Sequence, residues 1–94
     1  MLFLLMLAMP LRAQISGYII DEETGDSIPY ASVIYKGHNV AVASNINGRY
    51  TIARHEGRAL TFSAVGYVPK TVTIGANTKN TLDIRLKQDN RRLK

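Results

Sequence analysis

The chain contains no cysteine and no tryptophan among its 94 residues, and aromatic residues make up only 7% of it. Without cysteine it cannot form disulfides, use thiolate chemistry or hold zinc through cysteine ligands. Small exported domains often depend on disulfides, so this chain must be stabilised by sheet pairing and packing. A chain of this length holds at most one small domain.

Long apolar runs are scarce after the start of the chain, where residues 1–9 are all apolar and Pro10 ends the run. This run is too short for a membrane-spanning helix, which needs about 20 apolar residues, but it has the length of a signal-peptide core. Ala13 offers a small residue for cleavage. We predict a signal peptide over residues 1–13, cleavage after Ala13, and export to the periplasm or outer membrane. A buried N-terminal strand or helix is the alternative.

A clustered basic surface is also lacking, although the formal net charge is +5. The positive residues are scattered except in the tail KQDNRRLK, and no aromatic residues alternate with them. Nucleic-acid binding needs a clustered basic footprint, so we expect no nucleic-acid partner. We interpret residues 88–94 as a basic tail or the start of a linker.

Helical periodicity is nearly absent, and apolar and polar residues alternate along most of the chain after the leader. In TLDIRLK, for example, Leu82, Ile84 and Leu86 share one face, because successive side chains of a strand point to opposite sides. Seven strands are predicted, at 14–21 (QISGYIID), 30–36 (YASVIYK), 40–44 (VAVAS), 50–54 (YTIAR), 59–65 (ALTFSAV), 70–74 (KTVTI) and 81–87 (TLDIRLK).

Turn-forming residues separate these strands at a spacing of roughly 8–12 residues, which is typical of an all-β sandwich. No interval is long enough for the helical crossover that a parallel sheet needs. We predict an all-β, seven-stranded sandwich over residues 14–87, with a small closed barrel as the alternative. The predicted core consists of Ile19, Val33, Tyr50, Ile52, Leu60, Phe62, Val72, Ile74, Leu82, Ile84 and Leu86.

Catalytic residues are not indicated by the sequence. A nucleophile, a base and an acid could be assigned to Ser44, His55 and Glu56. However, the side chains of the adjacent residues His55 and Glu56 are expected to point apart. The chain has no GxSxG elbow and no glycine-rich phosphate-binding motif. We therefore expect no catalytic residues and interpret His38 and His55 as surface residues in turns.

Two segments resemble parts of calcium loops, but neither predicts a metal site. The acidic segment DEETGD at 21–26 is interpreted as a solvated loop with an Asx-type turn closed by Thr24 and Gly25. No metal or cofactor is expected there.

The segment SNINGRYT at 44–51 has the spacing of a calcium loop, with asparagine in both acid positions. We interpret it as a hairpin turn between two strands, because Asn47 and Gly48 both accept positive φ. This turn is expected to set the strand register and to deliver Tyr50 to the core.

In their order and spacing, these segments resemble the carboxypeptidase regulatory-like domain. The similarity rests on ISGYIIDEETGDSIPYASVIYKG, SNINGRYTI, LTFSAVGY and LDIRL, and it extends over residues 15–86. Asn45 and Asn47 stand where acids are usual in that family, which weakens an inherited cation site. The residues that match the family's motifs are Gly17, Thr24, Gly25, Pro29, Tyr30, Ala31, Val33, Asn47, Gly48, Tyr50, Phe62, Ser63, Gly66 and Tyr67.

The resemblance implies a transthyretin-like Greek-key sandwich that is not catalytic. Such a module lies beside the peptidase unit of some metallocarboxypeptidases, and in exported proteins of Bacteroidetes it commonly precedes an outer-membrane barrel. We therefore predict an accessory module that is the N-terminal domain of, or a fragment from, a TonB-dependent receptor or related surface protein. Its partner would be a protein, either the barrel or a periplasmic component. Its role would be protein–protein contact or spacing.

Two alternatives are kept for this module. One is an accessory domain of a secreted metallocarboxypeptidase. The other is a small carbohydrate-binding module, for which Tyr18 and Tyr67 would have to supply the aromatic platform in the absence of tryptophan.

Overall fold

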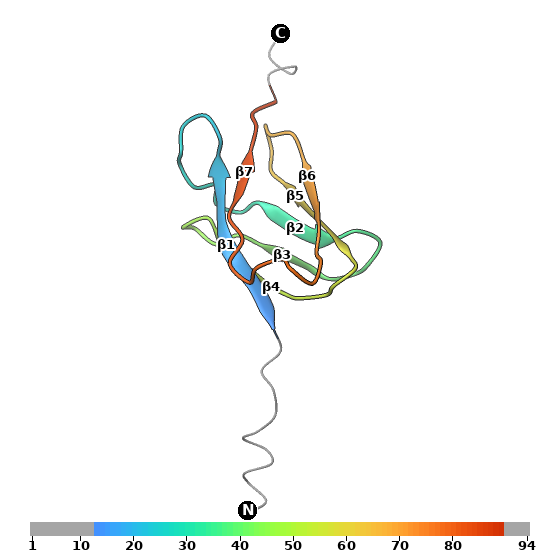
Figure 1. The fold of residues 1–94 in the computed structure, drawn as a ribbon. Helices are drawn as coiled ribbons and strands as arrows, with labels where there is room; N and C mark the ends of the chain where they lie inside the picture. Colours follow the sequence, from blue (N-terminus) through green and yellow to red (C-terminus); the bar gives the residue numbers. More distant parts are fainter. Residues whose placement is uncertain (1–12, 90–94) are drawn as a thin grey trace, which may run out of the picture.

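The computed structural model describes residues 13–89, so most of the predicted signal peptide and the end of the predicted tail lie outside it. Seven strands form two sheets that pack as a sandwich (Figure 1). Within 13–89, no helix has the length and hydropathy needed to cross a membrane. The strands are β1 (Gln14–Asp21), β2 (Ser32–Tyr35), β3 (Ala41–Ala43), β4 (Arg49–Ala53), β5 (Ala59–Ser63), β6 (Lys70–Thr73) and β7 (Ile84–Leu86).

One sheet has the strand order β4-β1-β7 and the other has the order β3-β2-β5-β6. All pairs in the four-stranded sheet are antiparallel, whereas β1 pairs antiparallel with β4 and parallel with β7. The predicted seven-stranded sandwich is confirmed, but the argument against parallel pairing is wrong. The short intervals do exclude a helical crossover between consecutive strands. However, the parallel strands β1 and β7 are the first and last strands, and the chain between them forms all the other strands.

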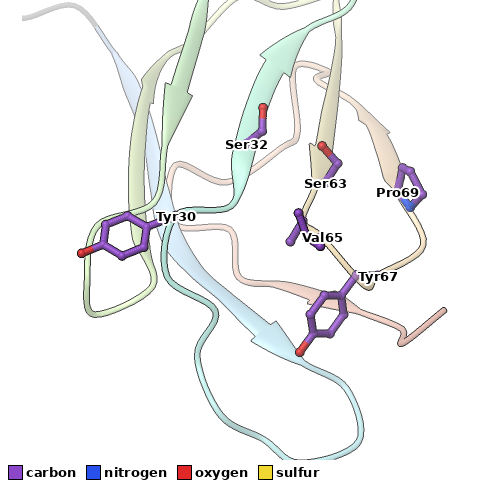
Figure 2. Close-up of a pocket in the computed structure, with 7 residues that line it drawn as sticks. Tyr30, Ser32, Ser63, Val65, Tyr67 and Pro69 are labelled. Carbon is purple, nitrogen blue, oxygen red and sulfur yellow. The ribbon is translucent and has the colours of Figure 1, made fainter. Parts of the chain in front are cut away.

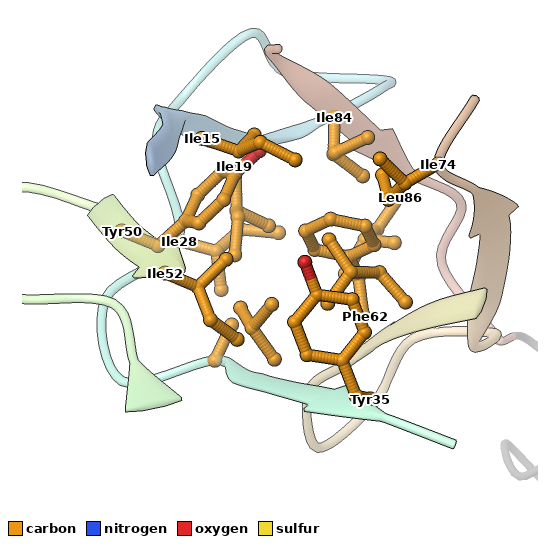
Figure 3. Close-up of a cluster of buried hydrophobic side chains, with 13 residues drawn as sticks. Ile15, Ile19, Ile28, Tyr35, Tyr50, Ile52, Phe62, Ile74, Ile84 and Leu86 are labelled. Atoms are coloured by element: carbon orange, nitrogen blue, oxygen red, sulfur yellow. The ribbon is translucent and has the colours of Figure 1, made fainter. Parts of the chain in front are cut away.

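The core lies between the two sheets and follows the alternation of the sequence (Figure 3). In the pair β2 and β5, Val33 lies opposite Phe62 and Tyr35 opposite Leu60, and all four side chains are buried. The Tyr50 ring meets the Phe62 ring edge-on, with 5.3 Å between centroids, a favoured aromatic geometry. The two sheets are thus held together by large buried side chains, such as Tyr50 from the edge strand β4 and Phe62 from the central strand β5.

Two residues predicted for the core are only partly buried, and four others complete it. Val72 lies on the edge strand β6, which has a neighbour on one side only. Leu82 lies ahead of β7, in a segment that crosses β1. The buried residues that the prediction left out are Ile15, Ile28, Ala31 and Tyr35.

Gly17 allows the chain that leads into β7 to pass directly over β1. A Cβ atom at this position would collide with the Leu82 carbonyl group. The Leu82 amide donates to the Ser16 carbonyl at 2.8 Å, and the Ser16 amide donates to the Asn80 carbonyl at 2.8 Å. The strand predicted to begin at residue 81 therefore begins only at Ile84, because the preceding residues bond to β1 individually.

The NING segment forms a tight turn, but not the predicted hairpin within one sheet. The Asn45 Oδ1 accepts hydrogen bonds from the amides of Asn47 and Arg49, at 2.9 and 3.0 Å. Gly48 has φ of +80°, while Asn47 does not adopt positive φ. The turn joins β3 of the four-stranded sheet to β4 of the three-stranded sheet. It therefore moves the chain between sheets and sets no register between β3 and β4.

This turn delivers Tyr50 to the core, as the sequence indicated. The Tyr50 side chain is 1% exposed, and its hydroxyl donates to the Leu82 carbonyl at 2.6 Å. Burial in the core, with Asp83 nearby, raises the pKa of Tyr50 far above its ordinary value. The hydroxyl therefore stays protonated and remains a donor.

We expect Gly48→Ala to destabilise the fold more than Gly57→Ala. Both glycines have positive φ, which costs a residue with a Cβ about 1–2 kcal/mol. At Gly57 the added Cβ meets no atom within 4 Å, whereas at Gly48 it lies 2.5 Å from the Ser27 Cβ. Urea unfolding of the two variants measures the difference, and equal losses of unfolding free energy would contradict the role given to this contact.

Candidate interaction surface

The residues considered for catalysis are not brought together in the fold. Ser44 is 1% exposed, and its hydroxyl donates to the Ile28 carbonyl and accepts from the Ala31 amide, both at 2.8 Å. Its oxygen therefore holds the chain between β1 and β2. His55 and Glu56 lie in the connection between β4 and β5, away from Ser44 in the chain.

The two histidines lie in separate turns, and no group of three or more potential metal ligands is found within residues 13–89. His38 is exposed after β2, as predicted. His55 is only partly exposed, because its ring packs edge-on against Tyr35 with 5.1 Å between centroids. The prediction of a surface position is therefore too simple for His55.

Asp21 departs from the predicted solvated acidic loop, whereas residues 22–26 are exposed as predicted. It ends β1 and is only 4% exposed. Its Oδ1 accepts from the amides of Glu23 and Thr24 at 2.7 and 3.0 Å, which makes the Asx-type turn. Its Oδ2 accepts from the Tyr67 hydroxyl at 2.6 Å and from Gln88 Nε2 at 2.9 Å. One carboxylate thus joins three segments that are far apart in sequence.

The protonation states of this cluster follow from those bonds. The hydrogen bond from Tyr67, and then that from Gln88, lower the pKa of Asp21 to about 2, against the opposing effect of burial. The same bond raises the pKa of Tyr67 to about 12. At neutral pH the cluster is therefore a charged carboxylate held by a protonated phenol.

The loop between β5 and β6 is also fixed to the C-terminal end of the domain by its backbone. The Val68 amide donates to the Lys87 carbonyl at 2.8 Å, and the Asp89 amide donates to the Gly66 carbonyl at 2.9 Å. With the Asp21 bonds, these contacts hold Tyr67 in a defined place.

A cavity of about 320 Å³ opens beside Tyr67, at one end of the four-stranded sheet (Figure 2). Val65 is 97% exposed and lies beside Tyr67, while the ring of Tyr30 points away from both (Figure 2). None of the described residues that line the cavity carries a charge. We call it the tyrosine pocket, and its lining consists of Tyr30, Ser32, Ser63, Ala64, Val65, Tyr67 and Pro69.

Tyr30 has an unusual backbone for an aromatic residue. Its φ of 60° is the only positive value at a non-glycine position among residues 13–89. Such a conformation costs about 1–3 kcal/mol and persists only when its surroundings enforce it. Here the Tyr30 amide donates to the Ser44 carbonyl at 3.0 Å, and Ala31 is held by the Ser44 side chain. The ring remains 69% exposed, so the strain presents an aromatic side chain to solvent.

The chemistry of the tyrosine pocket suits contact with another molecule rather than catalysis. It combines aromatic and aliphatic surface with hydroxyl groups, and it has neither a base nor a nucleophile activated by one. The hydroxyls of Tyr30, Ser32 and Ser63 make no hydrogen bond to any part of the chain that the structure describes. They are therefore available to a ligand.

The motif residues named from the sequence are spread over the domain. Ala31, Val33, Tyr50 and Phe62 belong to the core. Positive φ is found at Gly25, Gly48 and Gly66, and Gly17 allows a close backbone approach. Thr24 Oγ1 accepts from the Asp26 amide at 3.1 Å, and Pro29 is exposed ahead of Tyr30. Asn47 lies in the turn before β4. Three of the motif residues, Tyr30, Ser63 and Tyr67, line the pocket.

Tyr18, the other residue considered for carbohydrate binding, lies on the three-stranded sheet. Its side chain is 40% exposed, and the Arg49 guanidinium lies 5.7 Å from its ring centroid. Tyr18 and Tyr67 therefore do not form one platform. Sequence reasoning missed Val65, which belongs to no motif, and it placed Tyr30 in a family motif beside Pro29 and Ala31 without assigning it to a surface.

Comparisons with known proteins agree on the family to which this chain belongs. The family model of the CarboxypepD_reg-like domain matches residues 15–94. TonB-dependent receptor P26 of Formosa agariphila is 40% identical over 80 residues, which cover 85% of this chain and 8% of the receptor. TonB-dependent receptor P3 of the same organism is 28% identical over 92 residues, covering 94% of this chain and 9% of the receptor. The chain thus spans less than a tenth of these relatives, in their N-terminal part.

Among solved structures, the structure of the Streptococcal ancillary pilin is similar to this chain. The TM-score is 0.53 at 22% identity, over 83% of this chain and 30% of the pilin chain. This similarity concerns the fold alone.

We expect Tyr67→Phe to raise the pKa of Asp21 from about 2 toward its ordinary 3.8. Gln88→Ala should raise it less, because the hydrogen bond from Tyr67 is the larger cause. Titration of the carboxyl carbon by NMR measures both shifts. Since the folded-state pKa is depressed, Asp21 stabilises the fold above about pH 4, and this contribution is lost as pH falls toward 2. An Asp21 pKa unchanged by Tyr67→Phe would contradict the assigned bond.

Proposed function

Because the chain belongs to the CarboxypepD_reg-like domain family, we propose that it is a non-catalytic, exported module of a TonB-dependent outer-membrane receptor that makes a protein–protein contact in the periplasm. The relatives that support this are receptors of which the chain matches a small N-terminal part. The observation that carries the contact role is the tyrosine pocket, with Val65 97% and Tyr30 69% exposed beside it.

A contact role accounts for these exposed side chains better than a spacing role does. A spacer needs only a stable fold. Exposed apolar residues would lower its solubility and serve no purpose in spacing. Contiguous exposed apolar surface with polar groups at its border is the usual mark of an interaction site. The strained backbone at Tyr30 adds to this, because strain of this kind clusters at functional positions.

The two alternative roles have less support. The relatives named above are receptors and not peptidases, which disfavours an accessory domain of a carboxypeptidase. Carbohydrate binding draws on Tyr67, but the lining of the pocket offers hydroxyl groups without the amide or charged groups that would fix a sugar.

The test is site-specific photocrosslinking in the bacterium that makes the protein. A photoreactive phenylalanine analogue replaces Val65 in the full-length gene product, and the same analogue replaces Tyr18 as the control. Both positions are exposed, but Tyr18 lies on the other sheet. We expect one defined protein adduct from position 65, found in the cell-envelope fraction, and no such adduct from position 18.

Two results would contradict the proposed function. One is a protein that remains in the cytoplasm with its leader intact. The other is an identical adduct pattern from positions 65 and 18, because the pocket would then have no special part in contact.

A further inference from the structure

We propose that the tyrosine pocket binds a proline-rich segment of a partner protein that carries lysine or arginine and adopts the polyproline II conformation. This rests on the proposed contact function and specifies the chemistry of the partner. Three features of the pocket support it: the strands that form its floor, its aromatic and hydroxyl lining, and the acidic loop at its border.

The strands beside the pocket disfavour binding by strand addition. Ser32 and Ser63 are cross-strand neighbours on β2 and β5, the two central strands of the four-stranded sheet. Each of these strands is paired on both sides, although the pairing of β5 with β6 ends at Phe62, one residue before Ser63. Only the very end of β5 could therefore offer backbone groups to a new strand. A ligand at this place must be held by side chains and shape. Polyproline II meets this condition, because its backbone needs no sheet partner and is already extended.

The lining has the composition that recognises proline. Proline-rich segments dock in grooves lined by aromatic side chains, where the rigid pyrrolidine rings pack against them. Tyr67 supplies a ring beside Val65, with Pro69 at the border (Figure 2), and Tyr30 is the second aromatic residue of the lining. The unpaired hydroxyls of Ser32 and Ser63 can donate to the carbonyls of the segment, which polyproline II leaves free.

The Tyr67 side chain and the Tyr30 backbone are held in place before any ligand arrives. The Tyr67 hydroxyl is bound to Asp21, and the Tyr30 backbone is fixed by its bond to the Ser44 carbonyl. Binding to a preformed surface loses less side-chain freedom than binding to mobile side chains. A polyproline II segment is itself stiff, so the ordering cost is small on both sides.

Charge complementarity defines the other part of the ligand. Glu22, Glu23 and Asp26 are exposed in the loop that follows Asp21, and Tyr67 bonds directly to Asp21. This places an acidic border next to an uncharged lining, which favours a cation on the ligand. Lys70 adjoins Pro69 in the chain, so the basic residue of the segment is expected on the side of the acidic loop.

Calorimetric titration with synthetic peptides tests this inference on the purified chain. The probe is a peptide of three Lys-Pro-Pro repeats, and the controls are peptides of three Glu-Pro-Pro and three Lys-Gly-Gly repeats. We expect both controls to bind roughly tenfold more weakly than the probe, or not at all, where tenfold corresponds to about 1.4 kcal/mol. The glutamate peptide tests the charge and the glycine peptide tests the conformation.

Variants locate the binding on the pocket. Val65→Ser replaces an exposed apolar side chain with a polar one and leaves the core intact. We expect it to lower the affinity for the Lys-Pro-Pro peptide roughly tenfold. Tyr30→Gly should abolish binding while raising the unfolding free energy, because glycine adopts positive φ without strain. The double variant Glu22→Gln and Glu23→Gln should lower the affinity for the Lys-Pro-Pro peptide and make that affinity less dependent on salt concentration. Tyr18→Ala is the matched control and should bind as the unaltered chain does.

Three outcomes overturn the inference: no binding of the Lys-Pro-Pro peptide, equal binding of the glycine peptide, or equal weakening by Tyr18→Ala. Binding of a glycan that depends on Val65 and Tyr30, without peptide binding, would assign the pocket to carbohydrate. If position 65 still crosslinks to one protein in the cell while the peptide fails to bind, the contact function stands and only the proline-rich ligand is wrong.

Discussion

The carboxylate of Asp21 is the interaction on which the exposed end of the domain depends. It joins the end of β1 to the loop that carries Tyr67 and to Gln88, next to the last strand. Because both donors favour the ionised form, the charge that holds these segments is present throughout the physiological pH range. Without it, the phenol of Tyr67 would lose its hydrogen-bond partner, and only backbone bonds such as those at Val68 and Asp89 would hold this wall of the tyrosine pocket.

The sequence predicts the strands well because one face of each is buried, so the alternation is strict. The same alternation could have placed Asp21 inside, since it continues the inward series of Ile15, Gly17 and Ile19. What alternation cannot give is the partner, because Tyr67 approaches from 46 residues away. The turn before Tyr50 shows a similar limit: local side-chain bonds specify a turn, but long-range pairing decides which sheet the next strand joins.

The tyrosine pocket was not predictable from local sequence patterns. A tyrosine with positive φ contradicts local preference, and only the buried Ser44, which forms no recognisable motif, explains how it is held. Val65 is a valine that the predicted strand 59–65 would include, yet it lies beyond the end of β5 with its side chain in solvent. Departures from local rules are expected at functional positions, and here two of them line the same pocket.

This end of the sandwich is proposed as a preformed contact surface for a basic, proline-rich segment. An NMR titration of the isotope-labelled chain with the Lys-Pro-Pro peptide is the decisive measurement, because it shows where the ligand binds. We expect shifts concentrated at the amides that line the pocket, those of Tyr30, Ser32, Ser63, Val65 and Tyr67. Shifts centred on Tyr18 and the three-stranded sheet, or none at saturating peptide, would contradict it.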